Sequence, residues 1–381
     1  MKVLMSCGGT GGHIYPGIAI AQTIAEAYPD AELVFVGATD GQEKIIVPKE
    51  GYELHLLHVE GLRKPKLSPV NLRIGILALT ALHKAKELIR ELKPDLVIGT
   101  GGYACWPSVK AASELGIPTA LHESNAAPGK AVKKLQGSVN CIFTNFEQTA
   151  AYLPRARRIV RVGNPTRSGF RLLDYENVRR TLGIGSEKKL ILSVGGSGGA
   201  EHFNAAMLEL MSEYDRNEEN LIHVHAAGNR PGLYETMTEQ AAKAGLEGLE
   251  RIRIEKFIYN MPEYMAAADL IICRAGAMTI SELALLGKAC ILVPSPYVAN
   301  NHQYANAEVL FRAGAAGMIF EPKEENLKGS AFVPQVCEIL GDKNRADRMG
   351  QLIKQFALPD ANHRIEAEIA QLLGSRDEAS A

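Results

Sequence analysis

The chain has 381 residues, more than one hydrophobic core usually supports, so two domains are expected. Its 46% hydrophobic and 22% charged residues are typical of a globular protein and exclude a disordered, collagen-like or multi-span membrane chain. The formal net charge of -1 gives no sign of a nucleic-acid partner.

The first half of the chain alternates short β-branched runs with stretches of helical length. The first run, VLMS, is too short for a signal peptide and predicts a strand. Helices are expected at 14–27 and 72–92, and the later strand-like runs are LVFVG, LHLLHV, DLVIGTGG, PTALHE and CIFTN. This alternation predicts a parallel sheet covered by helices.

The same pattern restarts after VGNPTR, where Pro165 restricts Asn164 to extended geometry and marks a hinge. The strand-like runs of this half are KKLILSV, LIHVHAAG, RIRIEKFI, DLIICRAG, ACILVPSP and GAAGMIF. We therefore predict an α/β protein with an N-terminal domain at 1–163, a C-terminal domain at 164–342, and closing helices and a tail at 343–381. Sheets of this kind bind ligands at the carboxyl ends of their strands.

Three glycine-rich turns follow expected strands: GGTGGH at 8–13, GGSGGA at 195–200 and RAGAMTISE at 274–282. Glycine allows a sharp turn and close approach to a ligand, and the helix start that follows presents N–H groups to an anion such as pyrophosphate. A tight turn without a ligand explains a single loop of this kind equally well. In the third turn, a capping box of Thr279 and Glu282 is the structural alternative to a phosphate and ribose site.

Several other functions fit poorly. The Gly9-x-Gly11 pattern reaches Ile14 where a dinucleotide fingerprint has glycine or alanine, and no acidic residue directly follows LVFVG. A P-loop string is absent, which argues against hydrolysis of a nucleoside triphosphate. The six cysteines stand without a C-x-x-C spacing, so neither a zinc site nor a disulfide framework is indicated and a reducing cytoplasm fits best.

Seven motifs in one order carry a family resemblance: GGTGGHIYPG, GTGGYACWPS, HESNAAPG, VGNPTR, VGGSGGAEHFN, RAGAMTISEL and NNHQYANA. Together they resemble the peptidoglycan glycosyltransferases called MurG, which are UDP-N-acetylglucosamine:N-acetylmuramyl-(pentapeptide)-pyrophosphoryl-undecaprenol N-acetylglucosaminyltransferases. The resemblance implies a GT-B fold, with two Rossmann-like parallel-sheet domains facing a central cleft. It also implies that UDP-GlcNAc binds mainly to the second domain, that lipid I binds to the first, and that lipid II is the product.

The resemblance also implies the substrate-binding positions. These are Thr10, Gly11, Gly12, Asn125, Arg167, Ser197, Ile258, Ala277, Met278, Thr279, Ile280, Ser281, Glu282 and Gln303. Glu282 is the implied ribose partner, and Ile258 corresponds to a backbone position near the uracil. The sequence departs from the family pattern at Ala275, at Met278 and at His302, and an extra residue in SPYVANNHQ shifts the alignment around Gln303.

Transfer to an alcohol requires a base for the acceptor hydroxyl and dispersal of charge on the departing diphosphate. No Asp-x-Asp metal site is present in the sequence, so we expect no metal and no cofactor, and helix N-termini with Arg167 are the expected leaving-group stabilisers. His13 is the first candidate for the base because of its ordinary pKa of roughly 6.5 and its place at the first loop. Glu123, at the end of PTALHE, is the second candidate. Direct displacement inverts the anomeric centre.

The stretch 61–90 is basic and apolar, with Arg63, Lys64, Lys66 and Arg73 among leucine and isoleucine residues. It is too interrupted by charge to span a bilayer and is expected to rest on an anionic membrane surface. A core-facing helix with a solvated basic face is the alternative. The expected location is therefore peripheral, on the cytoplasmic face of the bacterial cell membrane.

Three other functions remain open from the sequence. A transferase of the same fold with another donor or acceptor is the nearest of them. A UDP-sugar epimerase would release its product without any acceptor. A nucleotide-binding module without catalysis would bind the donor and show no turnover.

Overall fold

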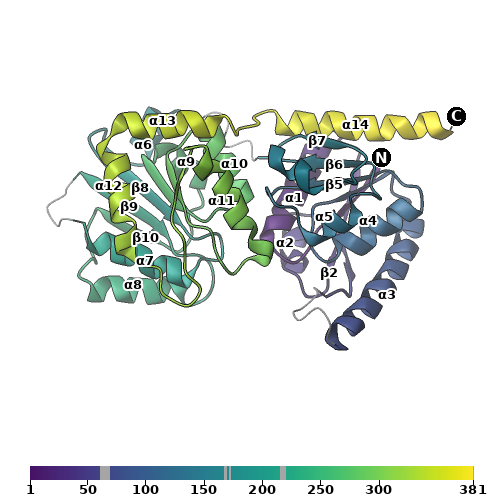
Figure 1. Ribbon diagram of the computed structural model, residues 1–381, viewed down its shortest axis with the longest axis horizontal. Helices are drawn as coiled ribbons and strands as arrows, with labels where there is room; N and C mark the ends of the chain where they lie inside the picture. Colours follow the sequence, from purple (N-terminus) through teal and green to yellow (C-terminus); the bar gives the residue numbers. More distant parts are fainter. Residues whose placement is uncertain (61–68, 167–169, 171–172, 215–219, 381) are drawn as a thin grey trace. The chain divides into compact units, whose positions relative to one another are not determined.

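The computed structural model describes residues 1–60, 69–166, 170, 173–214 and 220–380 (Figure 1). The chain divides into two compact units. Unit 1 comprises Met1–Arg167 together with Asp360–Ala381, and unit 2 comprises Ser168–Pro359. Each unit is built around one parallel sheet, which confirms the predicted α/β class with two parallel-sheet domains.

Among its described residues, unit 1 has a seven-stranded sheet in the order β3-β2-β1-β4-β5-β6-β7. The strands are β1 (Lys2–Ser6), β2 (Glu32–Ala38), β3 (Glu53–Leu57), β4 (Leu96–Gly99), β5 (Thr119–Glu123), β6 (Cys141–Thr144) and β7 (Ile159–Arg161). The helices are α1 (Gly11–Ala27), α2 (Glu43–Lys49), α3 (Pro69–Leu92), α4 (Cys105–Glu114), α5 (Lys130–Leu135), η1 (Glu147–Tyr152) and α14 (Ala361–Ser380). Successive residues of a strand point to opposite faces, so Leu4 packs in one core and Val3 and Met5 in the other.

Unit 2 has, among its described residues, a six-stranded sheet in the order β10-β9-β8-β11-β12-β13. The strands are β8 (Lys189–Val194), β9 (Leu221–Ala226), β10 (Ile252–Glu255), β11 (Leu270–Cys273), β12 (Cys290–Leu292) and β13 (Gly317–Met318). The helices are α6 (Tyr175–Thr181), α7 (Glu201–Ser212), α8 (Leu233–Lys243), α9 (Met261–Ala267), α10 (Ala277–Leu286), η3 (Ala299–Asn301), α11 (His302–Arg312), η4 (Gly329–Ala331), α12 (Val333–Gly341) and α13 (Lys343–Lys354). This strand order is that of a doubly wound dinucleotide-binding sheet.

The end of the chain does not form one closing segment. Helix α13 belongs to unit 2, whereas α14 returns to unit 1 and packs against α1 (Figure 1). Ile365 and Ile369 of α14 join the core that contains Ile14 and Ile18. The expected segment 343–381 is therefore divided between the units.

The division between the units at 167/168 lies four residues beyond the predicted boundary at 163/164. Hydrogen bonds explain the shift. The N–H of Asn164 donates to Oδ1 of Asn145 at 3.2 Å, and Nε2 of His122 donates to the carbonyl of Gly163 at 3.0 Å. These bonds attach the residues around the expected hinge to the sheet of unit 1.

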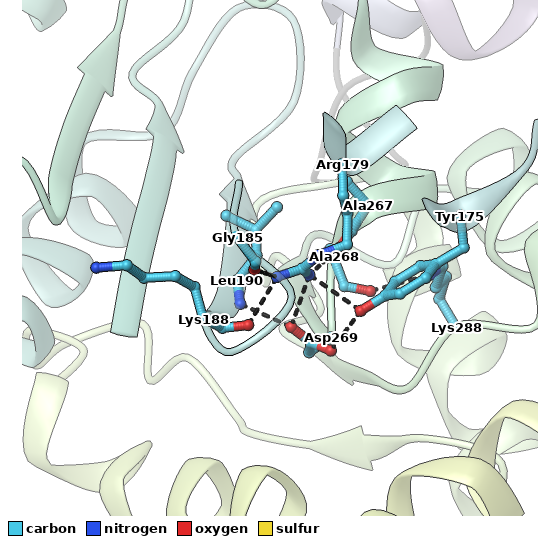
Figure 2. A network of polar contacts seen from close by, with 9 residues as sticks. All are labelled: Tyr175, Arg179, Gly185, Lys188, Leu190, Ala267, Ala268, Asp269 and Lys288. Carbon is cyan, nitrogen blue, oxygen red and sulfur yellow. Dashed lines mark hydrogen bonds and ion pairs between the residues drawn. The ribbon is translucent and has the colours of Figure 1, made fainter. Parts of the chain in front are cut away.

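A buried arginine organises the amino edge of the sheet in unit 2 (Figure 2). The side chain of Arg179 is 2% exposed and donates to the carbonyls of Gly185 (2.9 Å), Lys188 (2.6 Å) and Ala267 (2.9 Å). Its guanidinium also pairs with Asp269 at 3.1 Å. Because several bonds compensate the buried charge, this network holds α6 and α9 at the edge of the sheet where β8 and β11 begin.

Candidate active site

All three expected ligand loops lie where the strand order of their sheet reverses. In unit 1 the reversal falls between β1 and β4, and the first glycine loop follows β1 directly. In unit 2 it falls between β8 and β11, which lead into the second and third glycine turns. Ligands of open parallel sheets bind at this point, beyond the carboxyl ends of the strands. The topology therefore supports the three turns as ligand loops.

Glycine is required at Gly102, in the loop after β4, because that loop meets the backbone of the first glycine loop. Gly102, with φ +87°, lies so close to the first loop that a Cβ on it would be 2.0 Å from the carbonyl oxygen of Gly8. Helix α1 begins at Gly11 with Thr10 as an extended N-cap, and in the described part of the chain the Thr10 side chain makes no capping bond. Gly12 is exposed at this helix start. The loop thus presents backbone rather than side chains.

His13 is fixed in one tautomer by its neighbour. Its Nδ1 lies 3.0 Å from the carbonyl oxygen of Thr100, which can only accept, so Nδ1 carries the hydrogen and Nε2 is left as a proton acceptor. Burial lowers the pKa of the His13 imidazole below its ordinary value, and the Thr100 carbonyl and the charge of Glu43 act in the opposite direction. A half-buried, neutral histidine of this kind suits a general base near neutral pH.

Glu43 is a residue of this site that sequence reasoning missed. Its side chain is fully buried, with Oε2 accepting the N–H of Gly9 at 2.9 Å and Oε1 that of Ala38 at 2.6 Å. One amide of the first loop is therefore bonded to a carboxylate. The sequence signal is weak, because Glu43 stands in the polar run DGQEK and begins the short helix α2, which was not predicted.

Glu123 is buried and bound by several donors. Its Oε1 accepts bonds from the backbone and the side-chain nitrogen of Asn125, both at 3.0 Å, and its Oε2 accepts the N–H of Gly129 at 2.7 Å. A carboxylate with both oxygens engaged in this way orders the loop that carries Asn125. This geometry favours a positioning role for Glu123 and leaves His13 as the better placed base.

The second loop is more open than the first. Ser197 is exposed between two exposed glycines, and its carbonyl accepts the N–H of Asn229 at 2.9 Å. Close backbone packing recurs here, since a Cβ on Gly199 would lie 2.1 Å from the carbonyl oxygen of Ala227. The loop leads into α7, whose N-terminal N–H groups are suited to an anion.

The third turn differs from the capping-box alternative. Helix α10 begins at Ala277 with Gly276 as its N-cap, so Thr279 lies inside the helix and the capping-box alternative is wrong. Arg274, the first residue of the turn, is buried, pairs with Glu321 and lies 5.1 Å from the centre of the Phe203 ring. The turn is therefore held by its first residue rather than by a side-chain cap.

The remaining expected donor positions have different exposures. Those with buried side chains are Ile258, Ala277, Ile280 and Ser281, whereas Asn125, Met278, Thr279, Glu282 and Gln303 are half-buried. Oε1 of Gln303 accepts the N–H of Ser295 at 2.9 Å, which leaves the amide nitrogen of its side chain for other contacts. Arg167 lies outside the described residues. Ile258 and Ile280 have side chains suited to packing rather than to polar recognition.

Two further properties of the described residues concern metal ions and membranes. Among the described residues, no three His, Cys, Asp or Glu side chains gather in a way that would hold a metal ion. Within the same part of the chain, no helix combines the length and the apolar character that crossing a membrane requires.

Two doubly wound sheets with glycine loops at their switch points define a two-domain nucleotide-sugar enzyme of GT-B architecture. Known proteins agree with this class. Residues 3–144 match the glycosyltransferase family 28 N-terminal domain, and residues 190–365 match the family 28 C-terminal domain. The chain therefore belongs to glycosyltransferase family 28 and, within it, to the MurG family, as the sequence motifs predicted.

Individual relatives support that membership. A protein of Thermoanaerobacter sp. (strain X514) is 40% identical over 365 residues, covering 96% of this chain and 98% of its own. It is named UDP-N-acetylglucosamine--N-acetylmuramyl-(pentapeptide) pyrophosphoryl-undecaprenol N-acetylglucosamine transferase. The crystal structure of Acinetobacter baumannii MurG is similar with a TM-score of 0.76 and 26% identity, over 96% of this chain and 98% of that one.

The fold alone does not separate transferases from epimerases. UDP-GlcNAc 2-epimerase from Neisseria meningitidis bound to UDP-GlcNAc has a TM-score of 0.62 to this chain at 13% identity, over 97% of this chain and 100% of that one. Such a likeness shows shared architecture only. The assignment to a transferase family rests on the sequence relatives.

Proposed function

We propose that this glycosyltransferase moves N-acetylglucosamine from UDP-GlcNAc to the C4 hydroxyl of the N-acetylmuramoyl-pentapeptide of lipid I, which forms lipid II for peptidoglycan. The assignment of these substrates is supported by 40% identity, over 96% of this chain, to a transferase of that name. The observation on the structure that carries the chemistry is the His13–Thr100 hydrogen bond, because it leaves Nε2 of a neutral imidazole as the acceptor of a proton.

In this mechanism Nε2 of His13 takes the proton of the acceptor hydroxyl as the hydroxyl oxygen attacks C1 of the donor sugar. The bond from C1 to the UDP oxygen breaks, its electron pair leaves with the diphosphate, and the anomeric centre inverts. His13 later releases its proton to solvent. Thr10, Gly11 and Gly12 are proposed to contact the substrates beside the base.

The donor is proposed to bind in unit 2, at the carboxyl edge of its sheet. The N-termini of α7 and α10 follow the second and third turns and would stabilise the negative charge of the diphosphate. Ser197 is exposed at the first of these helix starts, and Glu282 lies half-buried on the second turn of α10, where it would bind the ribose. Gln303, in the same unit, is a further proposed donor contact, and Asn125 and Arg167 remain positions that the family resemblance implies.

Helix α3 is proposed to contact an anionic membrane surface on the cytoplasmic side. Its Ile74, Ala81 and Ile89 are buried, whereas Ile76 is 60% and Leu79 is 65% exposed. Exposed apolar side chains on a basic helix suit the boundary between headgroups and acyl chains. Arg73, on the same helix, is exposed and pairs with Glu60. The basic residues Arg63, Lys64 and Lys66 lie outside the described residues.

UDP release tests the proposal directly. UDP-GlcNAc is incubated with and without a lipid I analogue, with UDP-GalNAc and UDP-glucose as competing donors. Turnover that depends on the acceptor and is selective for UDP-GlcNAc is expected. Turnover without an acceptor would instead favour the epimerase, and donor binding without turnover would favour a module that only binds nucleotides.

A further inference from the structure

The carboxylate of Glu43 occupies a space that three glycines leave open. A Cβ on Gly8 would lie 2.9 Å from Oε1 of Glu43, one on Gly37 would lie 2.3 Å from its Cγ, and one on Gly41 would lie 2.0 Å from its Oε2. These glycines come from the loop after β1, from β2 and from the turn before α2. Three separate segments therefore lack side chains where this one carboxylate lies.

Packing alone does not explain why a carboxyl group stands in this buried position. Its two oxygens each accept one backbone N–H, from Gly9 and from Ala38. Removing a carboxylate from water is costly, and an apolar side chain of similar volume often stabilises a buried site at least as well. A carboxyl group whose two oxygens both accept backbone N–H groups in this position therefore calls for a role that an apolar side chain could not fill.

His13 is the partner on which that charge acts. Glu43 bonds to Gly9 in the loop that precedes His13, and Gly101, where a Cβ would lie 2.5 Å from Nδ1 of His13, is next to Gly102, which meets Gly8 of that loop. The titratable groups along the loop are Glu43 from α2, Cys7 at its start, Tyr15 of α1 at Gly11 and Tyr103, after β4, at Gly9. Burial raises the pKa of the Cys7 thiol far above its ordinary value, so Cys7 is neutral. The charge of Glu43 raises the pKa of His13, against the larger effect of burial.

We propose that Glu43 is a positioning residue of the active site, whose buried negative charge stabilises the imidazolium formed when His13 takes the proton of the acceptor. Its bond to Gly9 also fixes the loop that precedes His13. The inference rests on the proposed function, because it requires His13 to be the base. A fixed negative charge near a protonating histidine lowers the energy of the charged state without itself gaining the proton.

The test is Glu43→Gln in the full chain, with the imidazole of His13 followed by NMR across pH and with kcat/KM measured over the same range. The pKa of His13 should fall in the variant, and the acid limb of the kcat/KM profile should move to lower pH by the same amount. Because a weaker base transfers the proton less readily, kcat should fall about tenfold, while KM for UDP-GlcNAc stays unchanged. Loss of structure alone would lower the plateau without moving the limb.

Two variants control for charge and for folding. Glu50→Gln removes an exposed charge just after the same helix and should leave the pKa of His13 and the rate unchanged. Glu43→Asp keeps the charge but shortens the side chain, so the acid limb should stay near its wild-type position even where kcat falls. If Glu43→Gln does not fold, Glu43→Asp tests the proposal alone. This variant keeps the carboxyl group, so a shift of the acid limb of its kcat/KM profile would contradict the proposal.

Failure of this inference is separable from failure of the proposed function. An unchanged pKa of His13 in folded Glu43→Gln overturns the role of Glu43, whatever the activity. Full activity in His13→Ala overturns the assignment of the base and with it the catalytic role of Glu43, even where the NMR shift is found.

Discussion

His13 and Thr100 exchange two hydrogen bonds, although they are 87 positions apart in the sequence. Nδ1 of His13 donates to the carbonyl of Thr100 at 3.0 Å, and Oγ1 of Thr100 donates to the carbonyl of His13 at 2.7 Å. The pair joins the first turn of α1 to the end of β4, at the strand-order reversal of unit 1. The acceptor nitrogen of the proposed base is thus set by the backbone carbonyl of the residue that follows β4.

Replacing His13 tests that relationship through the rate. His13→Gln should lower kcat by about 10²- to 10⁴-fold, the usual contribution of a general base, with KM for UDP-GlcNAc little changed. The matched control is His58→Gln, which changes an exposed histidine of the same unit.

The pH dependence of the wild type is a separate test. The acid limb of its kcat/KM profile should have its midpoint below roughly pH 6.5, because burial lowers the pKa of His13 and the base must be neutral to act. A midpoint above that value would argue against this base.

Glu123→Gln should separate positioning from proton transfer. An amide in place of the carboxylate puts an N–H group against at least one of the donors from Asn125 and Gly129, so unfolding should become easier by about 1 to 3 kcal/mol. Because Asn125 is then less ordered, we expect KM for the donor to rise. The acid limb of kcat/KM should not move, and a limb displaced by this substitution would return Glu123 to the position of base.

The strands and the glycine turns that follow them were predictable from the sequence because their signals are local. Continuous apolar runs specify buried parallel strands, and the glycine turns follow those runs directly. Glu43 was not predictable for the opposite reason. Its helix α2 is short and contains Pro48, so neither length nor periodicity indicates it. Its carboxylate accepts the N–H of Ala38, five positions away, and that of Gly9, 34 positions away, which only the folded chain brings to it.

The last helix, α14, also shows that sequence patterns do not reveal contacts between distant parts of the chain. Ile365, Ile369 and Leu372 have the spacing of a helix with one apolar face, so a helix could be expected there. The face that covers them belongs to α1 and its neighbours, at the other end of the chain. Apolar periodicity indicates that a helix is buried on one side but not which sheet buries it.

Buried histidines should make the fold sensitive to acid. Burial lowers the pKa of His122 to about 4 and that of His225 to about 3, and it also lowers the pKa of His223. Below pH 6.5 the unfolded chain binds protons that the folded chain does not, so the free energy of unfolding should fall with pH by up to about 1.4 kcal/mol per unit for each histidine. Denaturant unfolding of His122→Gln should show a shallower dependence between pH 6.5 and pH 4 than wild type. His363→Gln, an exposed control, should not.

Arg179→Met should destabilise unit 2 without changing the chemistry. The substitution leaves Asp269 without its cation and removes the donor from several buried carbonyls, so unfolding should become easier by about 3 to 5 kcal/mol. Arg180→Met changes an exposed arginine next to it and should stay within about 0.5 kcal/mol of wild type. Since the network lies at the amino edge of the sheet, kcat per folded molecule should be preserved. A loss of kcat in the folded variant would show coupling to the glycine loops.

Membrane contact is tested by removing charge and apolar surface separately. Serine in place of Arg63, Lys64, Lys66 and Arg73 should weaken binding to anionic vesicles about a hundredfold or more, because each basic residue contributes roughly 1 kcal/mol near such a surface. The matched control replaces four lysines elsewhere in the unit by serine: Lys44, Lys49, Lys130 and Lys134.

Ile76→Ser with Leu79→Ser should weaken binding to anionic vesicles and remove the residual binding that persists in 0.5 M salt, because salt screens the charges but not the apolar contact. Vesicle co-sedimentation at low and at high salt measures the contributions of charge and of apolar contact to binding. If the four-serine variant of the basic stretch binds as wild type does while the lysine control does not, the membrane surface of this protein lies elsewhere in unit 1. Equal loss in both would show that net charge alone drives the association.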